Sequence, residues 1–287
     1  MRRIEKAFPP VGDFLTVDGV RLHYKSAGDG KPLVLLHGAS GNLRDWTFGP
    51  FAEMATTNTV IAFDRPGLGY SERPLGAEDP AVQAKILKRA TALLGHGNPI
   101  VAGHSYGGAV ALAWALLEPN DVSALLLLAA ASHEWPGETS RLYRAVTHPV
   151  IGPLAAQVLP RIASSKRINN AITRIFAPQT APDGYLGHVG AGLAVRPQTV
   201  RANASDIVAL KPHLVEMEGR YPLLNMPIEI LHGTDDVVVP IQIHSDRLAK
   251  ALPQARYQRL AGTGHMPHHC AQSQMLEALH RLNAQLA

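Results

Sequence analysis

The sequence is poor in cysteine and has no long apolar run. Its single cysteine, Cys270, cannot form an internal disulfide, which excludes a disulfide-stapled secreted scaffold and any metal site built from several cysteines. No apolar stretch reaches the ~18 residues that a membrane-spanning helix needs. The first residues combine positive charge with Pro9, Pro10 and Asp13 instead of an apolar segment, so no secretory signal is visible. These absences predict a soluble, cytoplasmic protein.

Charged residues are also few. They make up 17% of the 287 residues, and the net charge of +4 is too small to indicate a nucleic-acid-binding protein. The positive excess is confined to residues 132–221, which contain ten Lys or Arg and six Asp or Glu. This basic segment either steers an anionic substrate or forms an ordinary solvated surface. With 46% hydrophobic residues, the chain can build a globular core without disulfides.

The apolar residues form short continuous runs, which are typical of strands covered on both faces of a parallel sheet. These runs are residues 33–36, 60–63, 100–102, 124–129 and 228–231. Before them, residues 15–24 alternate around a glycine turn and predict a β-hairpin. Segments with helical periodicity separate or follow the runs, at residues 80–94, 106–117, 241–252 and 270–286. The pattern predicts an α/β protein with a mostly parallel, doubly wound sheet and a ligand site at the carboxyl ends of its strands.

The alternation of strand and helix stops between residues 132 and 221. This segment lacks a convincing strand and contains eight prolines, which predict short helices because proline breaks long ones. An apolar stripe at helical spacing, within residues 168–176, supports helices there. We therefore expect an α/β core formed by residues 1–131 and 222–287, and a helical lid, residues 132–221, inserted after strand 6.

A G-x-S-x-G motif, Gly103-His104-Ser105-Tyr106-Gly107, lies between the apolar run at 100–102 and an Ala- and Leu-rich helix. A serine on a sharp turn with a strained backbone needs neighbours without a Cβ two residues to either side, and the two glycines supply them. The motif also arises by chance in glycine-rich chains. Its strand–turn–helix context nevertheless favours Ser105 as a nucleophile, with the N–H of Tyr106 at a helix N-terminus where negative charge is stabilised.

Candidates for a general base and an orienting carboxylate follow Ser105 along the chain. A serine hydroxyl is a weak nucleophile, so a base must lie within hydrogen-bond reach and a third group must orient that base. Asp235 and Asp236 lie in the loop after the apolar run 228–231, and His265 lies in a glycine-rich loop after a predicted strand at 256–260. The order Ser, Asp, His is that of the α/β-hydrolases.

Four motifs make the chain resemble an α/β-hydrolase-fold serine hydrolase along nearly its whole length. They are the Ser105 elbow, the sequence HGASG at 37–41, the sequence DRPGLGYS at 64–71, and the acid and histidine loops. The resemblance implies that the N–H groups of Ala39 and Tyr106 form an oxyanion hole.

The resemblance also implies the catalytic carboxylate and the mechanism. In acid loops of this pattern the carboxylate stands three residues after the glycine and four before the proline, which selects Asp236 and leaves Asp235 as the runner-up. In the implied two-step acyl transfer, His265 takes the proton of Ser105, and Asp236 holds the tautomer of the imidazole. No metal or organic cofactor is implied.

Several further residues are candidates for substrate binding. They are His37, His104, Tyr143, Phe176 and Tyr185. The two histidines flank the oxyanion loop and the nucleophile, and each serves either a substrate or the surrounding structure. The aromatic residues form either the walls of the pocket or the core of the lid.

The histidine-rich sequence that follows Gly264 invites comparison with a metal site. His265, His268, His269 and Cys270 are close in sequence, but the H-E-x-x-H pattern of zinc proteases is absent. We therefore expect no bound metal.

The identity of the nucleophile narrows the chemistry. Dehalogenases and epoxide hydrolases of this fold need a carboxylate at the elbow, which Ser105 does not supply. Carbon–carbon bond hydrolases typically carry a more glycine-rich oxyanion loop and an asparagine before the nucleophile, where this chain has Ser40 and His104. A cofactor-free haloperoxidase or perhydrolase and a small-molecule receptor remain alternatives. The sequence favours hydrolysis of a small-molecule ester or lactone and leaves the oligomeric state open.

Overall fold

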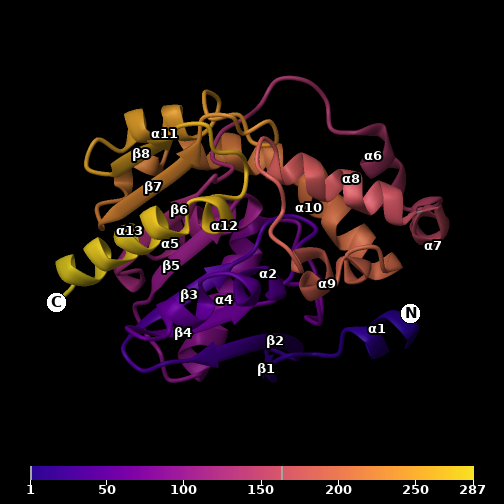
Figure 1. Ribbon diagram of the computed structural model, residues 1–287, viewed down its shortest axis with the longest axis horizontal. Helices are drawn as coiled ribbons and strands as arrows, with labels where there is room; N and C mark the ends of the chain where they lie inside the picture. The colour runs from indigo at the N-terminus through magenta and orange to yellow at the C-terminus, as the bar shows by residue number, and fades with distance from the viewer. Residues whose placement is uncertain (1, 163) are drawn as a thin grey trace.

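The computed structural model describes residues 2–162 and 164–287, and one eight-stranded sheet forms its centre (Figure 1). The strands are β1 (Asp13–Val17), β2 (Val20–Ala27), β3 (Lys31–Leu36), β4 (Asn58–Phe63), β5 (Ile100–His104), β6 (Ala124–Leu128), β7 (Ile228–Gly233) and β8 (Arg256–Leu260). Their order in the sheet is β1-β2-β4-β3-β5-β6-β7-β8. The pair β1–β2 and the pair β2–β4 are antiparallel, and all other neighbours are parallel. The predicted hairpin and mostly parallel sheet are confirmed.

Helices cover both faces of the sheet. The helices outside the segment between β6 and β7 are α1 (Arg2–Ala7), α2 (Arg44–Phe48), α3 (Phe51–Met54), α4 (Pro80–Leu93), α5 (Tyr106–Leu117), η1 (Pro119–Asp121), α11 (Ser245–Ala251), α12 (Pro267–Cys270) and α13 (Gln272–Gln285). Of these, α1 lies away from the sheet (Figure 1). Alternate residues of β3 show the two faces: Val34 and Leu36 pack in one buried cluster with α4 and α5, while Leu33 and Leu35 pack in another with α13. The continuous apolar runs are therefore strands with two buried faces.

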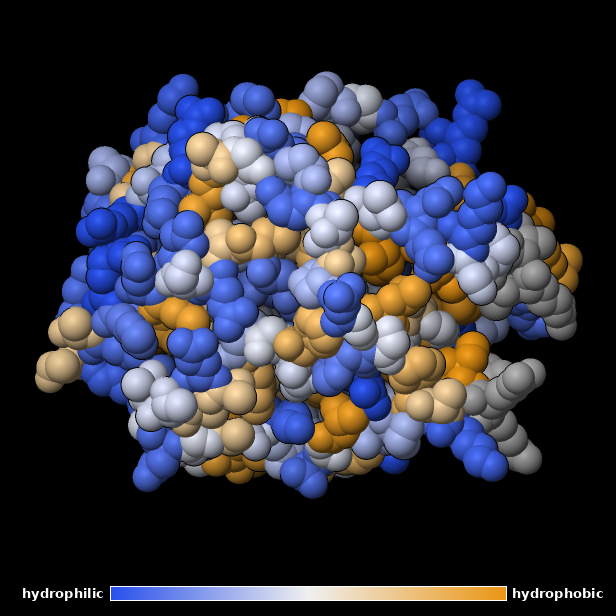
Figure 2. Space-filling model, in the orientation of Figure 1, coloured by the Kyte–Doolittle hydropathy of each residue, from blue (hydrophilic) through white to orange (hydrophobic). Residues whose placement is uncertain are grey.

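The described residues between β6 and β7 form a helical insertion, residues 129–227, and contain no strand. Its elements are α6 (Arg141–Thr147), α7 (Gly152–Ile162), α8 (Ser165–Phe176), α9 (Tyr185–Val189), η2 (Ala191–Leu193), α10 (Pro197–Glu218) and η3 (Tyr221–Leu223). The insertion after the sixth strand is as predicted, whereas the division into core and lid at 132 and 221 stays a prediction. The exposed apolar side chains of the insertion include Leu142, Val150, Ile151, Leu154 and Val158. Figure 2 shows hydrophobic surface, in orange, at the right edge of the molecule, where Figure 1 places α6 and α7.

The expectation of only short helices in the insertion is wrong for α10. This helix runs for 22 residues and contains Pro212 in its interior. Proline removes one helical hydrogen bond and costs about 3 kcal/mol. However, Leu210, Leu214 and Met217 are buried in the main core cluster, and burying each such side chain contributes about 1.5–3 kcal/mol. Packing against the core therefore outweighs the local effect of proline.

Among the residues that the structure describes, none of the helices combines the length and the apolarity needed to cross a bilayer.

Candidate active site

Ser105 stands on a strained turn between β5 and α5. Its backbone has φ 55° and ψ −119°, a conformation that L-residues rarely adopt. A Cβ on Gly103 would lie 2.4 Å from the carbonyl oxygen of Gly107, and a Cβ on Gly107 would lie 2.2 Å from that of Leu36. Only glycine fits at these two positions, for the steric reason that the motif suggested.

Asp236 and His265 form a buried hydrogen-bonded pair at the carboxyl end of the sheet. Asp236 Oδ2 lies 2.7 Å from His265 Nδ1 and 3.0 Å from His232 Nε2. Its Oδ1 accepts hydrogen bonds of 2.8 Å from the N–H groups of both Val238 and Val239. Burial raises the pKa of Asp236, but the hydrogen bonds from His232 and His265 outweigh burial and hold that pKa well below its usual range. The carboxylate is therefore ionised and fixed in orientation.

The two candidate aspartates have different surroundings. Asp235 is exposed, and its carboxylate accepts a hydrogen bond of 2.8 Å from the hydroxyl of Thr234. Only Asp236 contacts His265. The geometry thus agrees with the position that the loop pattern selected.

His232 is a member of this site that the sequence did not reveal. Its ring is fully buried, with Nδ1 2.6 Å from Ser245 Oγ and Nε2 2.8 Å from the carbonyl oxygen of Val239. With its proton on Nε2, the ring donates to Asp236 and Val239 and accepts from the hydroxyl of Ser245. The only available signal was the position of His232, directly before the glycine of the acid loop, and this position does not indicate which residues the ring contacts.

Three loops meet around Ser105. His104, the residue before it, lies with its ring centroid 4.8 Å from that of His265, and its Nε2 is 2.8 Å from the carbonyl oxygen of His265. A Cβ built on Gly38 would stand 3.1 Å from the Cβ of Ser105, so the loop at 37–41 touches the elbow. The structure therefore places the loops that carry the predicted nucleophile, the predicted base and the predicted oxyanion hole beside one another.

The two predicted oxyanion-hole residues are chain neighbours of Gly38 and Ser105. Ala39 follows Gly38 and is partly buried against the main core cluster, while Tyr106 is the first residue of α5. The ring of Tyr106 is buried, with the guanidinium of Arg65 4.3 Å from its centroid.

Helix α10 of the insertion makes hydrogen bonds and an ion pair that fix the oxyanion loop, residues 37–41, and the neighbouring Arg65. The N–H of Ser40 donates to Asn203 Oδ1 over 2.6 Å. Arg65, which is fully buried, donates from Nε to the carbonyl oxygen of His37 over 2.9 Å and pairs through Nη1 with Asp206, 3.1 Å away. Asn203 and Asp206 are distant in sequence from the loop, and no motif marks them.

The rings of His37 and His104 contact the surrounding loops, although His104 Nδ1 has no hydrogen-bond partner among the described residues, and a role for either ring in substrate binding stays a prediction. His37 lies with Nδ1 2.9 Å from the carbonyl oxygen of Gly38, and its Nε2 accepts the N–H of Arg65 over 3.0 Å, so both ring nitrogens have protein partners. Burial lowers the pKa of His37 to about 4. Burial, followed by the neighbouring His268 and His265, lowers the pKa of His104 well below its usual value. Both rings are therefore neutral near pH 7.

The three aromatic side chains that were predicted to contact a substrate are buried or partly buried. Phe176 and Tyr185 are 0% and 4% exposed and pack with Met266, the residue after the proposed base. The Tyr185 hydroxyl donates to Asp45 Oδ1 over 2.8 Å. Tyr143 is partly buried against a separate cluster within the insertion. Phe176 and Tyr185 thus join the insertion to the histidine loop, and a role for any of the three in substrate binding stays a prediction.

One group of described residues has the composition of a metal site. Donor atoms of Asp45, His104 and His268 lie within 4.8 Å of one another. Asp45 already accepts hydrogen bonds from His268 Nε2 at 3.0 Å and His269 Nε2 at 2.8 Å. Burial raises the pKa of Asp45, but His268 and His269 together hold it well below its usual value. These contacts describe a buried hydrogen-bond network, and the expectation of no metal stays a prediction.

Comparison with known proteins agrees with this architecture. The chain is 27% identical over 288 residues to an uncharacterised protein of Mycobacterium tuberculosis, covering 98% of this chain and 83% of that one. It is 26% identical over 268 residues to a 2-hydroxymuconate semialdehyde hydrolase of Pseudomonas putida, covering 90% and 88%. An esterase from Rhodococcus has the same fold, with a TM-score of 0.72, 23% identity, and coverage of 94% and 97%.

The family model for the alpha/beta hydrolase fold matches residues 31–270, a range that includes the elbow, both loops of the Asp236–His265 pair and the whole insertion. With its sheet order and its strained serine, the chain belongs to the alpha/beta hydrolase fold family.

Proposed function

We propose that this protein is a serine hydrolase that cleaves a carboxylic ester or a lactone of a small molecule. The observation that carries the proposal is the buried Asp236–His265 pair, with 2.7 Å between Oδ2 and Nδ1, on loops that meet the Ser105 elbow. Acyl transfer needs a serine, a base and a carboxylate that orients the base. The similarity in fold to the Rhodococcus esterase supports the same chemistry.

In the proposed reaction, His265 Nε2 accepts the proton of the Ser105 hydroxyl while the serine oxygen bonds to the carbonyl carbon. The carbonyl electron pair moves to its oxygen, which the N–H groups of Ala39 and Tyr106 stabilise. When the carbonyl reforms, the alcohol leaves with the proton held by His265. Water, deprotonated by His265, then releases the acyl group as a carboxylic acid and restores Ser105. Asp236 keeps the other imidazole proton on Nδ1 throughout.

Hydrolysis of a carbon–carbon bond is the second candidate. It is favoured by the relative from Pseudomonas putida, which matches 90% of this chain. Hydrolysis of an ester or lactone requires fewer catalytic groups, because its leaving oxygen needs only a proton from His265. For cleavage of a carbon–carbon bond, the site must also stabilise a carbanion. Turnover of 2-hydroxymuconate semialdehyde at a rate above that of every ester would favour this candidate.

A fluorophosphonate probe tests the proposal directly, because it reacts much faster with an activated serine than with an ordinary hydroxyl. We expect one covalent adduct per chain, located at Ser105 by peptide mapping. Labelling should disappear in Ser105→Ala and in His265→Ala, while the circular dichroism spectra stay unchanged.

A panel of aryl esters with different acyl chains, together with lactones of different ring sizes, then defines the substrate. Steady-state turnover should be lost by several orders of magnitude in Ser105→Ala. A folded protein that shows neither labelling nor turnover would contradict the proposal and favour a small-molecule receptor. Labelling at another residue would contradict the assignment of Ser105.

A further inference from the structure

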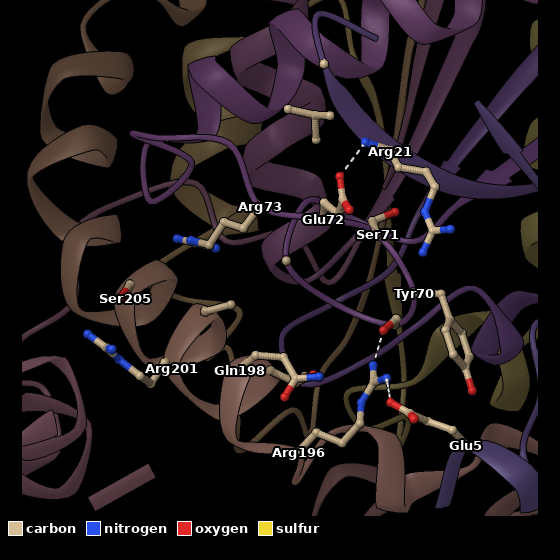
Figure 3. A pocket seen from close by; sticks show the side chains of 16 residues that line it. Glu5, Arg21, Tyr70, Ser71, Glu72, Arg73, Arg196, Gln198, Arg201 and Ser205 are labelled. Atoms are coloured by element: carbon tan, nitrogen blue, oxygen red, sulfur yellow. Dashed lines mark hydrogen bonds and ion pairs between the residues drawn. The ribbon is translucent and has the colours of Figure 1, made fainter. Parts of the chain in front are cut away.

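A large groove lies between the β1–β2 hairpin, the loop after β4 and the first turns of α10 (Figure 3). Its volume is about 830 Å³, enough for a small organic molecule. None of Ser105, Asp236, His265, Ala39 and Tyr106 lines it. The groove is therefore separate from the candidate active site.

The groove has an excess of positive charge. Four arginines and two glutamates line it, namely Arg21, Arg73, Arg196, Arg201, Glu5 and Glu72. Arg73 is paired with Asp206 at 2.8 Å, and Arg196 is paired with Glu5 at 3.2 Å. The lining residues alone thus carry a net charge of +2, which becomes +1 when Asp206, the partner of Arg73, is counted.

Arg21 and Arg201 supply the remaining positive charges, and Glu72, whose Oε2 accepts the backbone N–H of Arg21 over 2.9 Å, supplies the remaining negative charge. Both arginine side chains are exposed, and the part of the chain that the structure describes gives neither a carboxylate partner. Arg21 lies instead over the ring of Phe14, 4.5 Å from its centroid. Figure 3 shows Arg21 and Arg201 at opposite edges of the groove, with Arg73, Glu72 and Gln198 between them. Two guanidinium groups with free donors can approach an anion from both sides.

The start of α10 contributes the floor of the groove. The side chain of the N-cap residue Arg196 makes no capping hydrogen bond, and Pro197 has no N–H. The N–H groups of Gln198 and Thr199 fall in the first turn, where the helix itself provides no acceptor. The positive end of the dipole of a 22-residue helix thus opens into an arginine-lined groove.

Thr199 gives a second, independent indication of a ligand. It lines the groove, only 1% of its surface is exposed, and its hydroxyl has no hydrogen-bond partner among the described residues. A buried hydroxyl left without a partner is unfavourable, because it has lost its hydrogen bonds to water. An anion at the helix N-terminus would supply the missing acceptor.

We propose that this groove binds a small-molecule polyanion whose charged groups are phosphates or carboxylates. The ligand lies across the first turn of α10 with Arg21 and Arg201 on either side. Because Asn203 of the same helix holds the N–H of Ser40, the bound anion adjoins the element that supports the oxyanion loop.

Calorimetric titration of the full chain with pyrophosphate and, separately, with citrate tests this proposal. The Ser105→Ala variant is used alongside the wild type, so that binding is measured independently of any hydrolysis. At ~0.15 M salt, where distant charges are screened, we expect saturable one-site binding that is equal in both proteins. Binding of pyrophosphate alone indicates a phosphate ligand, and binding of citrate alone indicates a carboxylate ligand. Binding of both anions indicates that the groove recognises their negative charge.

Paired variants identify the site. Arg21→Gln combined with Arg201→Gln should weaken binding at least about tenfold, since each removes charged hydrogen-bond donors. The control, Arg174→Gln combined with Arg256→Gln, removes the same charge from exposed arginines outside the groove and should change the affinity less than about twofold.

The shape-conserving Thr199→Val should also weaken binding, by roughly three- to tenfold, because it removes one neutral hydrogen-bond donor. Absence of saturable binding by both anions would overturn the proposal. Equal losses in the two double variants would overturn it as well, because they would indicate attraction to the whole surface. Unchanged affinity in Thr199→Val would exclude binding at the helix N-terminus.

Discussion

The replacement of Asp236 by asparagine tests the central assignment of the site, because the structure determines what an amide would do there. All four surrounding groups are donors: the N–H groups of Val238 and Val239 at Oδ1, and His265 Nδ1 and His232 Nε2 at Oδ2. An asparagine has one acceptor oxygen and one NH₂ group. Whichever way the amide is turned, its NH₂ group must therefore face groups that are themselves hydrogen-bond donors.

If the amide oxygen faces the two backbone N–H groups, its NH₂ group faces His265. The imidazole must then carry its proton on Nε2, and it can no longer accept the proton of Ser105. Loss of the correct tautomer costs about 10⁴-fold in kcat in a triad of this kind. The opposite amide orientation leaves two backbone donors unsatisfied, at about 1–3 kcal/mol each. We therefore expect Asp236→Asn to lower kcat by about 10³–10⁴-fold and to lower the unfolding free energy.

The neighbouring Asp235→Asn is the matched control, because Asp235 is exposed and its carboxylate contacts only the hydroxyl of Thr234. It should alter kcat by less than about twofold, as surface substitutions usually do. Turnover of an aryl ester and the rate of fluorophosphonate labelling are measured for both variants, with urea denaturation to verify folding. An Asp236→Asn enzyme within tenfold of the wild type, or equal losses in both variants, would refute the reasoning.

Two further predictions concern stability. Gly103→Ala places a Cβ 2.4 Å from the carbonyl oxygen of Gly107 and should lower the unfolding free energy, measured in urea, by at least about 3 kcal/mol. The control is Gly97→Ala, whose Cβ meets nothing within 4 Å and which should not lower it. Equal effects of the two substitutions would contradict the steric argument. Burial lowers the pKa values of His37 and His268 from 6.5 to about 4, so the unfolded chain binds more protons in that range. These two rings alone should therefore lower the unfolding free energy by about 2 kcal/mol per pH unit as the pH decreases from 6 to 4.5, and the lowered pKa values of His133 and His244 should steepen the fall. A flat profile would contradict the lowered pKa values.

The parts of the fold that could be predicted are those that depend on local sequence. Continuous apolar runs such as residues 33–36 indicate strands with two buried faces, whatever the rest of the chain does. The Ser105 elbow was predictable for the same reason, since the steric demand for glycine falls two residues to either side. The choice of Asp236 over Asp235 depended on its spacing from the glycine and the proline of one loop.

The parts that could not be predicted depend on contacts between distant segments. Asn203 reaches the N–H of Ser40 across 163 residues, and Asp45 meets His268 across 223. No periodicity or motif encodes such pairs. The length of α10 was missed because the local cost of Pro212 is visible in the sequence, whereas the burial that offsets it appears only after the insertion packs against the core.

The contacts of α10 with the oxyanion loop bear on how this enzyme can be engineered. Arg65 is fully buried, and its carboxylate partner, Asp206, belongs to the insertion. A chimera that exchanges the whole insertion for that of another hydrolase would leave this guanidinium without a counter-ion, which typically costs about 3–5 kcal/mol. It would also leave the N–H of Ser40 without the oxygen of Asn203. Grafts that retain the face of α10 bearing both residues, and vary only the helices before it, would preserve these buried contacts with the core.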